Sequence, residues 1–143
     1  MGFTSVACQV MRNKKLDQLI VQLENYLECW KQFNSFINLA RGKKFSDEDE
    51  NQFLEVKSII VQELELISAA VECSSPSRQE VHELINSAPS LRYLGDSNEG
   101  NLRALENHWH KVYVGFLAIL GQLKVQQREL ENKSVLSIFS KKK

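Results

Sequence analysis

The feature that most constrains the fold is an uncharged apolar run, Val112–Leu120, in the C-terminal third of the chain. Charged residues make up 25% of the sequence, yet none occurs in these nine positions. A helix with a single buried face would carry polar residues at every third or fourth position. We therefore expect this run to be covered on more than one side, either at the centre of a helical bundle or against a second chain.

Length and composition predict one all-α domain that spans residues 1–143. The chain has 143 residues, and 43% of them are hydrophobic, which is ordinary for a soluble globular protein. It contains only 6 glycines and 2 prolines. Because so few residues break helices or form tight turns, we expect long helices rather than many short strands.

Apolar residues that recur every three or four positions predict three long helices, over residues 15–41, 46–73 and 99–132. A short amphipathic segment (3–11) precedes them, and a polar break at 12–15 separates it from the first long helix. A fourth, shorter helical element occupies 77–94.

Capping residues set the expected helix boundaries. Ser46 and Asp49 have the spacing of a capping box, and Ser77 with Glu80 repeats it. Gly42 is the expected C-cap of the first long helix. Pro89 should end the helical turn before it, because the residue that precedes a proline is pushed out of the helical region.

The elements favour an antiparallel helical bundle of three long helices plus one shorter segment, with a four-helix up-down-up-down topology. If residues 74–98 only cross one end of the bundle, the last helix would instead run parallel to the first. Three other elements are available to cover Val112–Leu120, so a central position is favoured over an interface.

The sequence contains one weak candidate for a metal-binding or catalytic site, Glu106 with His110. These side chains share a helix face at i, i+4 and could hold a metal weakly, although a solvated charge pair is the simpler interpretation. The paired Glu-x-x-His motifs of di-metal bundles are absent. We expect no cofactor and no resident metal. Without a catalytic constellation, we expect a protein that is not an enzyme.

Gly115, Ala118 and Gly121 repeat at a spacing of three inside the last helix. A glycine inside a helix costs about 1 kcal/mol relative to alanine, so a compensating reason is expected. That reason could be the close approach of a neighbouring helix, room for a large side chain, or a pocket for an apolar ligand.

Charge and cysteine usage limit partners and compartment. Lys plus Arg equals Asp plus Glu, at 18 each, so a dedicated nucleic-acid binder is not expected. Three cysteines (Cys8, Cys29 and Cys73) form no Cys-x-x-Cys motif, and an odd number does not suit a disulfide framework. A reducing compartment follows, and we predict a cytoplasmic protein.

The tail, 134–143, combines apolar residues with terminal lysines. It could pack onto its own bundle, dock into a partner protein's groove, or contact an anionic membrane surface. Its candidate interaction residues are Val135, Leu136, Ile138 and Phe139.

Within the apolar run, Tyr113, Val114 and Leu117 are the candidate contacts for a second chain. We therefore predict a non-enzymatic helical bundle that acts by protein–protein interaction or self-association. The alternatives are a bundle that binds a small ligand or metal, and a peripheral membrane adaptor that docks through its terminal segments.

Overall fold

A computed structural model describes the backbone of residues 2–71 and 75–141 and the side chains of residues 14–71 and 75–136. Within these ranges the chain is helical and contains no strand, which confirms the all-α class. The described residues form five helices: α1 (Gly2–Arg41), α2 (Asp47–Ala70), α3 (Arg78–Asn86), α4 (Leu91–Gly95) and α5 (Glu99–Lys141).

The first helix is longer than predicted. Residues 3–11 and 15–41 belong to a single helix of 40 residues, and the break predicted at 12–15 is wrong. Lysine and arginine are good helix formers, and Lys14 and Lys15 are exposed on the helix surface. Because no glycine or proline lies between Gly2 and Gly42, nothing in that stretch terminates the helix.

The last helix also continues beyond its predicted end at residue 132. The segment predicted as a separate tail (134–143) is helical as far as Lys141. Neither glycine nor proline follows Gly121, so the helix extends through the polar stretch around Lys133. Val135 and Leu136 are exposed on it, whereas the side chains of Ile138 and Phe139 lie outside the described residues.

The predicted segment 77–94 contains two short helices, α3 and α4. Pro89 lies between them, where the sequence placed a break. Helix α3 packs against α2 and α5, and α4 packs against α1 and α2. The Glu50 carboxylate holds α4 to the start of α2, because it accepts hydrogen bonds from the backbone N–H groups of Leu91 at 2.7 Å and Arg92 at 3.4 Å.

The capping box at the start of α2 is confirmed. Ser46 Oγ accepts from the backbone N–H of Asp49 at 3.1 Å, and the Asp49 carboxylate accepts from the Ser46 N–H at 2.9 Å. Helix α1 ends at Arg41, directly before Gly42, where the sequence predicted its C-cap. Lys43, with φ 58°, takes the left-handed conformation in the turn that follows.

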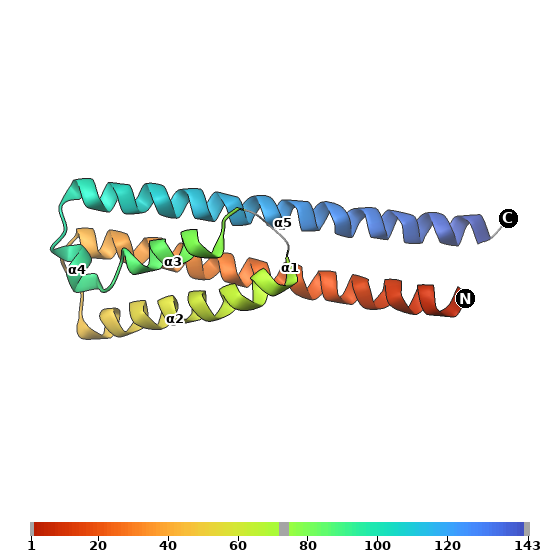
Figure 1. The fold of residues 1–143 in the computed structure, drawn as a ribbon, viewed down its shortest axis with the longest axis horizontal. Coiled ribbons are helices and arrows are strands. Elements are labelled where there is room, and N and C mark those ends of the chain that lie inside the picture. The colour runs from red at the N-terminus through yellow and green to blue at the C-terminus, as the bar shows by residue number, and fades with distance from the viewer. Residues whose placement is uncertain (1, 72–74, 142–143) are drawn as a thin grey trace.

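Helices α1 and α5 lie side by side and run in opposite directions, with both chain termini at the same end (Figure 1). Their halves nearest the termini extend past α2 and α3. The aromatic core lies where the other elements cover them. Phe116 of α5 contacts Tyr26 and Trp30 of α1, with ring centroids 5.2 and 6.4 Å apart.

The apolar residues that recur every three or four positions form a seam along each long helix, and these predicted seams supply much of the core. Buried seam residues of the three long helices are Leu23, Tyr26, Trp30, Phe33, Ile37, Ala40, Phe53, Val56, Ile60, Leu64, Ile67, Leu102, Leu105, Val112, Phe116, Ile119 and Leu123. Two polar contacts accompany this packing. Tyr26 donates its O–H to the Ile60 carbonyl at 3.1 Å, and Trp109 Nε1 donates to the Trp30 carbonyl at 2.7 Å. Each satisfies a polar group of an otherwise apolar side chain.

Gly115 and Gly121, both inside α5, have different environments. A Cβ at Gly115 would lie 2.8 Å from Pro76 Cδ, so this glycine makes room for a ring in the connection before α3. The close contact at Gly115 therefore comes from the buried Pro76 ring and not from a neighbouring helix. A Cβ at Gly121 would meet no atom of the described chain within 4 Å.

This contrast predicts opposite effects for two matched substitutions, Gly115→Ala and Gly121→Ala. Both should gain about 1 kcal/mol of helix propensity. Only Gly115→Ala should also lose about 1–3 kcal/mol through overpacking against the rigid proline ring. Urea denaturation followed by circular dichroism would compare them, and we expect Gly121→Ala to be the more stable variant. Equal stabilities would contradict the Pro76 contact.

Candidate interaction surface

One face of the apolar run in α5 is uncovered. Val112, Phe116, Ile119 and Leu120 are buried, as predicted for a central helix. In contrast, the side chains of Val114 and Leu117 are 45% and 40% exposed. The expectation that neighbouring elements cover the run on most sides is therefore wrong. Only one side of α5 faces the bundle, and the opposite side meets solvent.

The uncovered residues form a continuous stripe along α5, which we call the outer stripe: Val114, Leu117, Ala118, Gly121 and Val125. A helix turns about 100° per residue, so Val114 and Ala118, each two residues from Phe116, lie on the side opposite that buried ring. Val125 continues the stripe and is 55% exposed.

Charge is excluded from this surface and returns at both ends. No charged residue occurs between Lys111 and Lys124. Beyond Val125 the helix surface becomes charged again, with Arg128 and Glu129. The outer stripe is thus an apolar strip with charged ends, which resembles the apolar centre and polar rim of protein interfaces.

Other predicted interaction residues lie in different environments. Val135 is 50% exposed and Leu136 is 67% exposed. Leu136 follows Val125 by three helical turns and therefore shares its face. Tyr113 is half-buried and stacks on Trp109, with ring centroids 5.0 Å apart. It belongs to the edge of the core rather than to the outer stripe.

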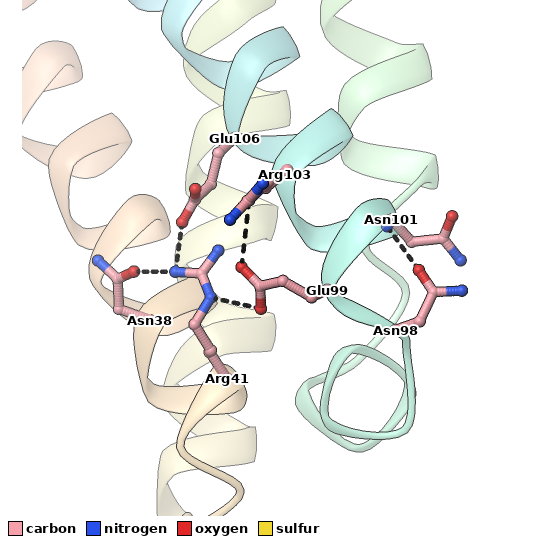
Figure 2. A network of polar contacts seen from close by, with 7 residues as sticks. All are labelled: Asn38, Arg41, Asn98, Glu99, Asn101, Arg103 and Glu106. Carbon is pink, nitrogen blue, oxygen red and sulfur yellow. Dashed lines mark hydrogen bonds and ion pairs between the residues drawn. The ribbon is translucent and has the colours of Figure 1, made fainter.

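Glu106, the first member of the candidate pair with His110, binds a different residue. Its carboxylate contacts Arg41 at 2.7 Å, and the His110 side chain is exposed. Arg41 Nε also contacts Glu99 at 3.1 Å, and Arg41 Nη1 donates to Asn38 Oδ1 at 2.8 Å (Figure 2). The hydrogen bond to Glu106, together with the nearby carboxylates, raises the pKa of Arg41. This network joins the end of α1 to the start of α5.

Besides the outer stripe, the structure has an apolar groove between α1 and α2, which sequence reasoning did not find. It is a groove of about 650 Å³ whose lining includes Val21, Ile59 and Leu66. These three side chains are 57%, 37% and 54% exposed. The available signal was that each is a large apolar residue outside the predicted seam of its helix. Cys29 also lines this groove.

Other chemistry has little support among the described residues. No group of three or more His, Cys, Asp or Glu side chains within them could hold a metal ion. In the same part of the chain, no helix combines the length and apolarity needed to cross a membrane. In the part of the chain that the structure describes, the fold is an all-helical bundle that exposes the outer stripe and the α1–α2 groove. No family model matches this chain, and neither a curated protein nor a solved structure shows significant similarity to it.

The position of Cys29 in the α1–α2 groove leads to a prediction about how the reactivity of its thiol depends on pH. Burial, with smaller contributions from Glu63 and Glu28, raises the pKa of its thiol. The reactive thiolate should therefore form at higher pH than in a free cysteine peptide. In a variant with Cys8→Ser and Cys73→Ser, the pH profile of iodoacetamide alkylation should be displaced upward.

Unfolding in urea provides the control, because it should return the profile to that of the peptide. If the groove only slowed the access of iodoacetamide to Cys29, the alkylation rate would fall at every pH and the midpoint of the pH profile would not move. A native midpoint equal to the unfolded one would contradict the raised pKa of Cys29.

Proposed function

We propose that this protein is a non-enzymatic helical bundle that binds another protein chain through the outer stripe of α5. The observation that carries the proposal is the exposure of Val114, Leu117 and Val125 on a helix whose opposite face forms the core. The partner would be a protein or a second copy of the chain, and neither nucleic acid nor a cofactor is required.

Burial of apolar area supplies the free energy for such binding. Each Å² of apolar surface removed from water contributes about 25 cal/mol. The core of α5 does not need apolar residues on its outer side, since one seam suffices to hold a helix in a bundle. Polar residues at these positions would suit a solvated surface, so the apolar stripe favours a surface that is covered in a complex.

The polar clusters between the helices favour a structural rather than a catalytic role. Arg41 links α1 to α5 through Glu99 and Glu106. Glu50 links α2 to α4. Farther along the bundle, Gln127 of α5 donates to Asp17 of α1 at 2.7 Å. Each cluster joins two helices, as expected of contacts that hold a bundle together.

As part of this proposal, α1, α2, α3 and α5 form an up-down-up-down bundle in which α3 is the shortened third member. Contacts of α3 with both α2 and α5 favour this topology. Helix α3 has 9 residues and α5 has 43, so α3 packs against only a short part of α5. The outer stripe therefore remains uncovered by elements of the same chain.

Photo-crosslinking in cells that express the full chain tests the binding surface. A benzophenone amino acid would replace Leu117 in the outer stripe or, as the matched control, Leu54 of α2. These leucines are 40% and 42% exposed, so accessibility does not distinguish them. We expect a discrete protein adduct from position 117 and none from position 54.

A second variant ties the adduct to the apolar stripe. Val125→Lys places a charge on the exposed face, and we expect it to reduce the adduct about tenfold, equivalent to ~1.4 kcal/mol. Circular dichroism should show an unchanged fold, because Val125 is 55% exposed. Equal adducts from positions 117 and 54, or an adduct that Val125→Lys does not change, would overturn the proposal.

A further inference from the structure

The α1–α2 groove is an exposed apolar surface that the proposed function does not use. We propose that it docks an amphipathic helix of a partner protein, and that lysine or arginine residues follow the edges of that helix's apolar face. The inference is independent of the outer stripe, because no residue of the stripe lines the groove. The shape of the groove, its apolar residues and the sign of its charge together support this occupant.

The groove is long enough for a helix. Its volume of about 650 Å³ continues into a depression of about 480 Å³, and Ile59 lines both. We call the two together the extended groove. On α1 it reaches from Asp17 to Phe36, which is about 28 Å along the helix axis. A small molecule would occupy only part of this length, whereas a helix of about 19 residues would match it.

The lining of the extended groove has the spacing that receives a third helix. Gln52, Ile59 and Leu66 of α2 recur every seven positions, so they form a row along the groove. Cys29 and Phe36 repeat this spacing on α1. In helical bundles, the side chains of one helix pack between such rows on its neighbours.

Exposed apolar side chains in the groove favour a surface that becomes covered. Val21, Ile59 and Leu66 lie outside the buried seams of their helices, so the core of the bundle does not require apolar residues at these positions. A docked helix would remove them from water, and this burial supplies free energy for binding.

Every charged residue in the described lining is acidic. Asp17 and Glu63 line the α1–α2 groove, and Glu55 lines its continuation. In the part of the chain that the structure describes, no lysine or arginine lines either depression, although the whole chain has 18 basic and 18 acidic residues. Because charges across protein interfaces are complementary in sign, the edges of the bound helix should be basic.

No cation of the same chain neutralises these carboxylates among the described residues, since none of the three takes part in an ion pair there. Asp17 accepts a hydrogen bond from the neutral amide of Gln127 at 2.7 Å, and Glu63 accepts one from Gln22 at 3.1 Å. Burial, and then the negative charge of Glu63, raises the pKa of the Cys29 thiol. The charge of Glu63 therefore acts inside the groove.

The positions of the carboxylates predict where the basic residues of the partner helix lie. Glu55 and Glu63 are eight positions apart on the α2 side, or about 12 Å along the axis. A helix parallel or antiparallel to α2 presents residues seven or eight positions apart at nearly the same spacing. Two basic residues so spaced on one edge would pair with these glutamates, and a third on the other edge would reach Asp17 of α1.

Fluorescence anisotropy with the purified full chain tests the sign of the charge. The probe is a fluorescein-labelled helical peptide with leucine on one face and lysine along both edges of that face. The control peptide has glutamate in place of every lysine. At low salt we expect the lysine peptide to bind at least about tenfold more tightly, and we expect added salt to reduce the difference. Equal affinities, or an absence of binding by the lysine peptide, would overturn the proposal.

Two matched variants connect the binding to the carboxylates of the groove. Glu55→Lys reverses a charge in the extended groove, and Glu131→Lys makes the same change on α5. Both glutamates are exposed, so circular dichroism should show an unchanged fold for each variant. We expect Glu55→Lys to weaken binding of the lysine peptide about tenfold and Glu131→Lys to change it less than about twofold. Equal losses in the two variants would contradict docking in the groove.

Alkylation of Cys29 shows whether the peptide occupies the groove, because this thiol is part of the lining. In the chain with Cys8→Ser and Cys73→Ser, a saturating amount of the lysine peptide should slow the reaction with iodoacetamide at least about tenfold. In urea the peptide should give no protection. A peptide that binds the folded chain and leaves the alkylation rate unchanged would place its site elsewhere and refute the inference.

Discussion

Trp30 of α1 and Phe116 of α5 stack at the point where the two longest helices meet the rest of the bundle. Tyr26 and Phe33 pack edge-on against Trp30, and Trp109 returns a hydrogen bond to its carbonyl. This packing sets the rotation of α5 about its axis. With Phe116 directed inward, Val114 and Ala118 must face outward, so the core contact itself creates the exposed stripe.

Other helices cover α1 and α5 along only part of their length, and the candidate surfaces depend on which parts are covered. Helices α2, α3 and α4 pack around the part of α1 and α5 far from the chain termini (Figure 1). Toward the termini, α1 and α5 continue beyond them. The α1–α2 groove and the outer stripe lie on different faces of the molecule. Each is exposed because no short helix covers that side of α1 or α5.

Sequence periodicity predicted the seams and most caps well, because both depend on residues close together in the chain. Ser46 and Asp49 form the predicted capping box. Two predicted boundaries were wrong, at 12–15 and after residue 132, because polar residues alone do not end a helix that lacks glycine and proline. The pairing of Glu106 with Arg41 instead of His110 depended on a residue 65 positions away, which no local pattern reveals.

The amino-acid sequence by itself determined the all-helical class, the buried seams and the apolar character of Val112–Leu120, since these follow from composition and local spacing. Only the tertiary structure decided which side of that run is covered. Apolarity all round a helix shows that burial is favourable on every side, but not whether a neighbour is present. That depends on where α3 ends and where Pro76 crosses Gly115, which are contacts between distant parts of the chain.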